Sequence, residues 1–158
     1  MDAAVKKQAL RLFTYGLYAV MTSDKDEVNA FTANWLTQVS FEPPLVAVSI
    51  ENDAKSLTMI RNSGTFTINV LRTGQRELAG TLGKSALKAP DKLAGIPHTK
   101  TEEGYPILES AVGWVACEVR QMVLTGDSTL VIAEVVDAGL LAEGQPLTMA
   151  EAGFRHAG

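Results

Sequence analysis

The sequence predicts a mainly β protein, a closed antiparallel barrel of six or seven strands with a few short helices at its sides. Two observations support this fold. Short segments that are apolar, or that alternate apolar and polar residues, follow one another at the spacing of hairpins. Segments with helical spacing are short and do not separate the strands regularly, which argues against a doubly wound parallel sheet. With 158 residues, no linker and no internal repeat, one domain over residues 1–158 is expected.

The first part of the chain predicts one helix and one hairpin. A helix is expected over residues 2–14, because apolar residues recur there at i, i+4, i+7 and i+8. Residues 17–23 are apolar and aromatic enough for a buried strand. The charged run 24–27 then forms a turn, and Val28 begins the return strand.

The stretch from Asn29 to Ser56 is expected to organise the rest of the fold. It consists of two strands joined by a Glu-Pro-Pro corner at Glu42–Pro44. Proline cannot donate a ladder hydrogen bond, so the corner belongs at a strand entry or a sheet edge. Many potential core positions of the first strand are Thr, Asn, Gln and Ser. Buried hydroxyls and amides need partners, so a polar ligand lying along this ribbon would explain them. A polar face that simply meets water is the alternative.

The middle of the chain alternates short helices with one strand. Helical spacing and a Ser-Gly stop predict a helix over residues 55–63. The segment 65–71 alternates as a strand does, and residues 75–82 predict a second short helix. Residues 83–105 are rich in Gly, Pro and Lys and should form a long irregular segment. Loops of this length in a compact domain are more often functional than not.

The last third of the chain is strand-like. Residues 111–125 alternate, so that Ala116 and Cys117 are expected on opposite faces, and residues 126–128 turn the chain. Residues 129–138 form the return strand. The tail, 146–158, is polar and contains glycine.

Composition excludes several classes of protein. The net charge of −4 argues against a nucleic-acid binder. No apolar run approaches the ~18 residues that span a bilayer, and no signal peptide is evident at the N-terminus. Cys117 is the only cysteine, so it has no internal disulfide partner, which fits a cytoplasmic location. One Cys and two His make a Cys/His metal site improbable. The GxGxxG and GxxxxGK[ST] nucleotide loops are absent.

Charge is unevenly distributed along the chain. Residues 55–100 contain eight basic residues and only Glu77 and Asp91 as acidic ones, which gives +8 − 2 = +6. The remainder therefore carries −10. A basic segment in an acidic protein can attract a compact anion such as a phosphate. A solvated, charged helical face would have the same composition.

Four segments together resemble the flavin reductase-like group of FMN-binding split barrels, which includes flavoredoxins and domains fused to other redox modules. No single motif is diagnostic, but their order and spacing make the resemblance specific over nearly the whole chain. They are TANWLTQVSFEPPLVAVSI (32–50), TFTINVL (65–71), GDSTLVIAEVVDAG (126–139) and PLTMAEAGFRHAG (146–158). The resemblance implies a split antiparallel barrel.

The resemblance also implies which residues would contact the flavin. The isoalloxazine and ribityl region would be lined by Asn29, Thr32, Ala33, Asn34, Trp35, Thr37 and Gln38, and the ribityl chain bordered by Ser49, Ile50, Glu51 and Asn52. The phosphate would be held by Lys55, Ser56 and Lys92, with Ser85 a weaker candidate, while Asn69 and Val70 would close the wall and Phe154 would cover the flavin.

Each of these roles has a structural alternative. Trp35 could be ordinary core, Ser56 a plain residue of a helix N-terminus and Phe154 a hydrophobic anchor for the tail. Ser128 marks a departure from the group, because many reductases have Gly-Asp-His in the late hairpin, where the His is associated with flavin and nicotinamide binding. A serine hydroxyl can still hydrogen-bond, but it neither stacks nor carries charge near neutral pH. Direct use of NAD(P)H is therefore in doubt.

The expected function is that of a flavin-dependent oxidoreductase. It would bind FMN, with FAD possible, and pass electrons from NAD(P)H or a protein donor through the flavin to an acceptor. A flavoredoxin-type electron carrier with tightly bound FMN and no NAD(P)H activity is the alternative, and a non-catalytic barrel is the third reading. The resemblance implies a homodimer and a possible redox partner protein, with no nucleic acid and no membrane as partners.

Overall fold

The fold is known from a computed structural model that describes residues 1–157. In chain order the strands are β1 (Tyr18–Asp24), β2 (Glu27–Ala33), β3 (Leu36–Ser40), β4 (Leu45–Glu51), β5 (Thr65–Val70), β6 (His98–Lys100), β7 (Pro106–Leu108), β8 (Gly113–Thr125) and β9 (Ser128–Leu140). The helices are α1 (Ala3–Leu10), α2 (Lys55–Ser63), α3 (Arg76–Leu82) and α4 (Met149–Ala152).

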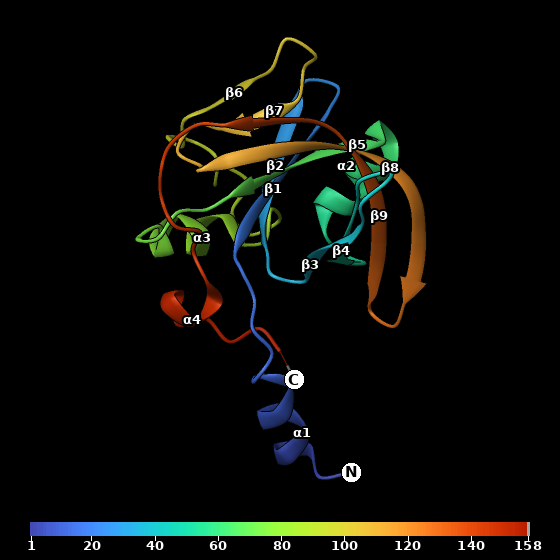
Figure 1. The fold of residues 1–158 in the computed structure, drawn as a ribbon, viewed down its shortest axis with the longest axis vertical. Coiled ribbons are helices and arrows are strands. Elements are labelled where there is room, and N and C mark those ends of the chain that lie inside the picture. The colour runs from blue at the N-terminus through green and yellow to red at the C-terminus, as the bar shows by residue number, and fades with distance from the viewer. Residues whose placement is uncertain (158) are drawn as a thin grey trace.

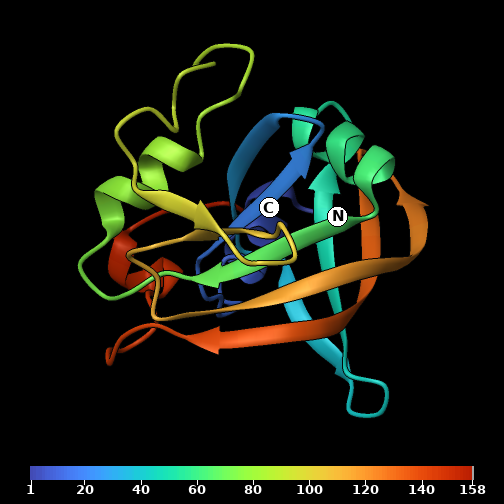
Figure 2. The ribbon, with the colours of Figure 1, turned by 90° about the horizontal axis from the view of Figure 1, so that it is seen from above.

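Seven of the strands form one antiparallel sheet in the order β2-β1-β5-β8-β9-β4-β3 (Figure 1). Seen from above, the sheet curls round on itself (Figure 2). Its edge strands β2 and β3 are consecutive in the chain, yet they are not neighbours in the sheet. The mainly β, antiparallel fold with few short helices is thus confirmed. The open seam between β2 and β3 agrees with the split barrel that the resemblance implied.

Two apolar clusters lie on opposite faces of β1. Ala19 and Met21 belong to the cluster under α3, and Val20 belongs to the cluster that α2 covers. A strand buried on both faces is apolar over most of its length, as the expected strand 17–23 is from Leu17 to Met21. Residues Leu57 and Ile60 anchor α2 to its cluster. Burying side chains of this size contributes about 1.5–3 kcal/mol each, which holds α2 firmly on the sheet.

The helix α2 has the bounds that its sequence predicted. Its buried residues include Leu57 and Ile60, one turn apart, so a single apolar stripe faces the sheet. The helix ends at Gly64, which adopts a left-handed conformation (φ 73°) and donates its N–H to the carbonyl of Ile60 at 2.7 Å. Glycine takes this conformation without a Cβ clash, and that is why the chain leaves the helix there.

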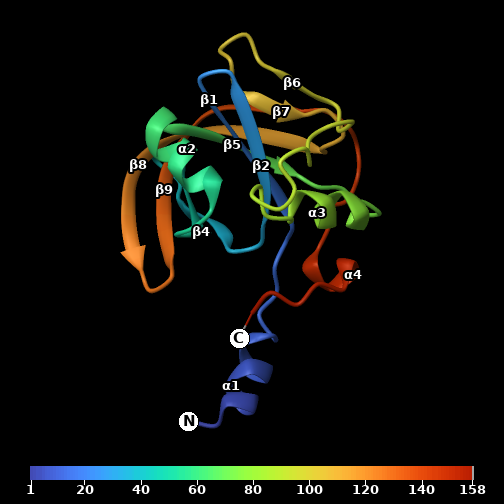
Figure 3. The ribbon, with the colours of Figure 1, turned by 180° about the vertical axis from the view of Figure 1, so that it is seen from behind.

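The prediction for the first helix is wrong at its C-terminal end. The helix α1 ends at Leu10 rather than at residue 14, because Leu12 and Phe13 donate to carbonyls only three residues back, in turns that do not continue an α-helix. The helix projects from the barrel and buries none of its residues (Figure 1, Figure 3). Leu12 and Phe13 are 81% and 62% exposed.

The prediction that residues alternate strictly between the two faces of β8 is also wrong. Ala116 and Cys117 are both fully buried, because a β-bulge between them shifts the register against β9. The last two strands begin and end within two residues of the predicted bounds, as do β1, β5 and α3. Residues 83–105 are irregular as expected, except for β6, which pairs with β7 in a separate two-stranded sheet.

Candidate functional site

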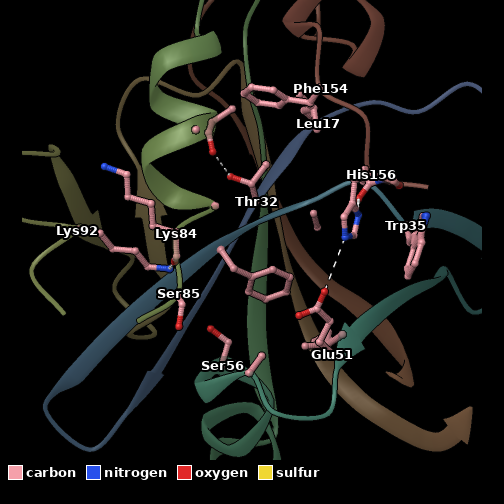
Figure 4. Close-up of a pocket in the computed structure, with 18 of the residues that line it drawn as sticks. Leu17, Thr32, Trp35, Glu51, Ser56, Lys84, Ser85, Lys92, Phe154 and His156 are labelled. Atoms are coloured by element: carbon pink, nitrogen blue, oxygen red, sulfur yellow. Dashed lines mark hydrogen bonds and ion pairs between the residues drawn. The ribbon is translucent and has the colours of Figure 1, made fainter. Parts of the chain in front are cut away.

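A cavity of about 980 Å³ lies beside β2, between the first turn of α2 and the end of α3 (Figure 4). The loop after α3 forms one wall, and the C-terminal segment, residues 153–156, crosses it. The chain between β2 and β3 and the end of β4 form the opposite wall. This position follows from packing, because α2 and α3 are each fixed to an apolar cluster and β2 runs between them.

The first turn of α2 opens into the cavity. The first N–H groups of any α-helix have no partner within the helix, and here the N-cap residue Ala54 has no side chain that could accept from them. No acidic residue lies in this turn. Ser56 is 2% exposed, and its Oγ accepts a hydrogen bond from Asn29 Nδ2 at 2.8 Å. Because Asn29 uses the acceptor side of this hydroxyl, the O–H of Ser56 is left to donate into the cavity.

Positive charge predominates among the charged residues that line the cavity. Lys55, Lys84, Lys88, Lys92 and Arg155 all line it, whereas only Glu51 and Asp53 line it with the opposite charge. Lys55 makes an ion pair with Glu27 on the neighbouring hairpin. A helix N-terminus together with several cations is a suitable site for a compact anion.

The ammonium group of Lys92 is held at the end of α3. The side chain is buried, and its Nζ donates to the carbonyls of Leu82 at 3.0 Å and Lys84 at 2.7 Å. The cation thereby bonds two carbonyls at the C-terminal end of a helix, where the helix dipole favours positive charge. Burial lowers the pKa of Lys92 below its usual value, since the charged form loses hydration.

Small residues leave room along β2. Thr32 donates from Oγ1 to the carbonyl of Ala79 at 2.6 Å, which ties β2 to α3 (Figure 4). At Gly83 a Cβ atom would lie 3.2 Å from the carbonyl oxygen of Ala79, and at Gly80 one would lie 3.7 Å from the ring of Phe154. Both glycines line the cavity. Neither position carries a side chain that would take up space in the cavity.

Four side chains meet at the far rim of the cavity. His156 Nδ1 lies 2.9 Å from Asn34 Oδ1, and Asn34 Nδ2 donates to the carbonyl of His156 at 3.2 Å. The imidazole also lies against Trp35, with ring centroids 4.9 Å apart. His156 Nε2 is 3.7 Å from Glu51 Oε1 (Figure 4).

Most of the residues predicted to contact the flavin are brought together by this cavity. Those that line it are Asn29, Thr32, Ala33, Asn34, Trp35, Ser49, Ile50, Glu51, Lys55, Ser56, Lys92 and Phe154, with Ser85, the weaker candidate, also in the lining. They come from five separate parts of the chain. That these residues bind a flavin remains a prediction.

Six predicted residues lie outside the lining. Thr37 and Gln38 are exposed on β3, and Asn52 is in the turn after β4, where its Oδ1 accepts from Thr129. Val70 lines a second, apolar hollow of about 370 Å³ on another face of the sheet. The remaining two are Asn69 and Ser128. The side chain of Asn69 is fully buried and hydrogen-bonded within the protein.

Ser128 lies close to the far rim although it does not line the cavity. It is the register partner of Glu51 across the β4–β9 ladder, and its hydroxyl contacts Asp127 at 3.2 Å. Glu51 in turn faces His156. Glu51 therefore lies between an imidazole of the C-terminal segment and the strand position where this chain has a serine.

The expectation that inward-facing amides and hydroxyls would lack protein partners is wrong. Among the described residues, every buried side-chain nitrogen and oxygen has a hydrogen-bond partner. Asn29 bonds to Ser56, Thr32 to Ala79 and Asn34 to His156. The polar residues of the ribbon thus connect it to α2, α3 and the C-terminal segment, and this network shapes the cavity.

Several lining residues were not predicted individually. Lys84 and Lys88 belong to the basic segment whose excess charge was noted, so their charge was a usable signal. Gly80, Gly83, Arg155 and His156 gave no such signal, because their role depends on how the C-terminal segment crosses α3 and β2. No group of three or more His, Cys, Asp or Glu suited to a metal ion occurs within residues 1–157. None of the helices in the same range is both long and apolar enough to cross a membrane.

Comparison with known proteins shows the family of this chain. The flavin reductase like domain matches residues 10–158. An NADH-dependent flavin reductase of Rhodococcus sp. is 36% identical over 152 residues, which are 94% of this chain and 83% of that protein. A high molecular weight rubredoxin of Moorella thermoacetica is 33% identical over 145 residues, 90% of this chain, and the chain spans 63% of that relative's length.

The same grouping follows from solved structures. Flavin reductase PheA2 in its native state superposes with a TM-score of 0.81 at 30% sequence identity, over 94% of this chain and 93% of that one. The sequence match and the fold therefore agree over nearly all of the chain. The chain belongs to the flavin reductase-like family and is a flavin-dependent oxidoreductase.

Proposed function

We propose that the cavity binds FMN, with its phosphate at the first turn of α2. The observation that supports this most directly is the uncapped N-terminus of α2, which opens into a cavity lined by Ser56 and several lysines. One helix terminus of this kind suits one phosphate, which favours FMN over FAD. The ring system would then lie along β2, between Thr32 and Trp35, where Gly80 and Gly83 leave space.

The residues of the cavity have distinct tasks in this proposal. When bound, the flavin supplies the electron-transfer chemistry itself. Asn29 orients the hydroxyl of Ser56 so that it donates toward the anion. Lys92 holds the loop after α3 against the helix end, which keeps the neighbouring cations beside the phosphate. Phe154, fixed by Arg76 at 5.2 Å from its ring centroid, covers the cavity and excludes water from it.

We propose that electrons reach the flavin from NAD(P)H, or from a protein donor if the protein acts as a flavoredoxin-type carrier. The Rhodococcus relative is an NADH-dependent flavin reductase, which supports the first possibility. The buried Ser128 favours the second, because its hydroxyl bonds to Asp127 and does not line the cavity. The similarity to the high molecular weight rubredoxin of Moorella thermoacetica supports a redox protein as the partner.

One experiment tests binding and donor together. The purified protein is examined for flavin absorbance, titrated with FMN and with FAD, and then mixed without oxygen with NADH or NADPH. We expect FMN to bind more tightly than FAD, and bleaching by a nicotinamide would assign the reductase activity. Bleaching only by a reduced protein would assign the carrier role. A protein that takes up neither flavin would overturn the proposal.

FMN binding should weaken at alkaline pH, and Lys92 should account for part of this. Burial lowers the pKa of Lys92 in the free protein, and a nearby phosphate dianion would favour the charged form and raise that pKa again. Binding therefore takes up a proton as the pH rises through the lowered pKa, and the affinity falls by up to about tenfold per pH unit over this interval.

The matched variant for this measurement is Lys92→Arg, which stays charged throughout. Fluorescence-quenching titrations from neutral pH up to the ordinary lysine pKa of 10.5 should show a steeper loss of FMN affinity for the wild type than for Lys92→Arg. Equal slopes for the two proteins would rule out a role for the Lys92 proton.

We also propose a cytoplasmic homodimer. Two apolar surfaces could receive a second copy of the chain. One is formed by the exposed Leu12 and Phe13 of the projecting N-terminal segment, and the other is the apolar hollow around Val70 and Trp114. Light scattering at micromolar concentration should give twice the 16.9 kDa chain mass. A monomer mass would contradict the dimer and leave the flavin proposal unchanged.

A further inference from the structure

The C-terminal segment crosses the cavity like a strap that is fixed on both sides. On the α3 side, Arg76 donates to the carbonyl of Ala152 and lies over the ring of Phe154. The carboxylate of Glu151 accepts from Thr73 and from the N–H of Gly74, which ties α4 to the turn after β5. Gly153, in a left-handed conformation (φ 74°), then ends α4 and directs the chain across the cavity.

On the far side the strap is fixed by His156. Its ring and its carbonyl use both the acceptor and the donor of the Asn34 side chain, and its ring lies against Trp35. Asn34 is buried at the point where β2 ends and the sheet is open. A double contact to a buried amide fixes the strap more firmly than a surface ion pair would.

The contact with Glu51 is the weaker part of this attachment. The side chains of His156 and Glu51 are 56% and 63% exposed and 3.7 Å apart, and exposed pairs of this kind contribute little. The hydrogen bonds to Asn34 and the contact with Trp35 therefore determine whether the strap stays closed.

We propose that His156 is a positioning residue that holds the strap over the cavity and so controls how fast the flavin leaves. This inference rests on the proposed FMN site. Phe154, Arg155 and His156 all line the cavity and belong to the strap, so the flavin exchanges only when the strap lifts on its His156 side. The attachment at Arg76 and Glu151 remains in place, which makes residues 153–156 the part that moves.

Two measurements test the role of His156. The first is hydrogen exchange of the Asn34 side-chain amide in flavin-free protein, because its Nδ2 donates to the carbonyl of His156 and loses that bond when the strap opens. The second is FMN release after dilution of the loaded protein, followed by the rise in flavin fluorescence. His156→Ala should accelerate both by about three- to tenfold, the factor expected for loss of one partly buried hydrogen bond.

Conservative variants separate the contacts. His156→Asn places an amide nitrogen near the position of Nδ1 and should restore slow release in part, because it can donate to Asn34 Oδ1. Glu51→Gln should change the exchange rate in flavin-free protein by less than about twofold, as expected for an exposed pair. His98→Ala is the control, since His98 is exposed on β6 and its ring contacts only the carbonyl of Ile96.

The outcomes distinguish this inference from the proposed function. Wild-type protein that binds FMN, with unchanged exchange and release in His156→Ala, would overturn the role of His156 and leave the FMN site intact. Wild-type protein that binds no FMN would overturn the proposed function and with it control of release by His156. Faster exchange and faster release in His156→Ala, with partial recovery in His156→Asn, would establish that His156 holds the strap closed.

Discussion

Ser56→Asp should abolish measurable FMN binding while leaving the protein folded. Both outcomes depend on the helix terminus at which the new carboxylate would lie. A carboxylate in the first turn of α2 interacts favourably with the helix dipole, worth about 0.3–1 kcal/mol. Asn29 Nδ2, which now donates to Ser56 Oγ, can donate to the new carboxylate instead. The fold therefore tolerates the charge.

The same carboxylate would repel the phosphate of FMN. Ser56 lines the cavity and is 2% exposed, so the two negative charges would meet where water screens them poorly. Opposing like charges at an interface costs several kcal/mol, which corresponds to at least about 100-fold weaker binding. Fluorescence-quenching titration gives the affinity, and thermal unfolding gives the stability.

Thr58→Asp is the charge-matched control for this experiment. Thr58 belongs to the same helix, is exposed and does not line the cavity, so its substitution adds the same charge without placing it beside the phosphate. It should leave FMN affinity within about threefold of the wild type, as expected for a solvent-screened charge. If Ser56→Asp bound FMN as tightly as Thr58→Asp does, the phosphate would have to lie elsewhere.

The sequence was sufficient to predict the elements whose apolar pattern is local. The helix α2 has one apolar stripe and a glycine stop, and both signals lie within the helix and its next residue. The hairpin of β1 and β2 was equally predictable, because its charged turn separates two strands directly. In these cases the residues that define the element are neighbours in the chain.

Other features of the fold could not be predicted from the sequence, because they depend on contacts between segments that are distant in the chain. The bulge at Ala116 and Cys117 arises from pairing with β9, so the alternation of β8 alone does not reveal it. The ribbon that starts at Asn29 was expected as one strand up to the proline corner, but it breaks at Asn34 and Trp35. There the two edges of the sheet separate, and His156 from the other end of the chain bonds to Asn34.

This break also explains why the polar residues of the ribbon were misinterpreted. Buried Thr and Asn side chains in a strand need hydrogen-bond partners, and from the sequence we expected a bound ligand to supply them. In the folded chain, α2, α3 and the C-terminal segment supply those partners instead. A cavity does lie beside the ribbon, but the polar residues alone do not indicate a ligand, because polar groups with protein partners can also line a cavity.

Asn69→Ala should destabilise the protein by about 3–4 kcal/mol and leave the FMN affinity of the folded protein unchanged. Asn69 is fully buried on β5. Its Nδ2 donates to the carbonyl of Ala19 at 3.1 Å and to Thr67 Oγ1 at 3.0 Å, and its Oδ1 accepts from the N–H of Leu108 at 2.9 Å. Removing the amide takes the partner from the N–H of Leu108, and an unsatisfied buried group costs about 1–3 kcal/mol. It also removes one hydrogen bond each from the carbonyl of Ala19 and from Thr67, whose hydroxyl still donates to the carbonyl of Pro106.

The comparison of stability with affinity decides which role Asn69 has. The resemblance placed Asn69 in the wall of the flavin site, but it does not line the cavity and all its hydrogen bonds are to the protein. Urea unfolding should therefore show the loss of stability, and FMN titration under native conditions should show an affinity within about threefold of the wild type. Thr37→Ala, at an exposed position on β3, should alter neither quantity. A large loss of affinity in Asn69→Ala, with stability retained, would instead return Asn69 to the flavin site and require the cavity to extend across β5.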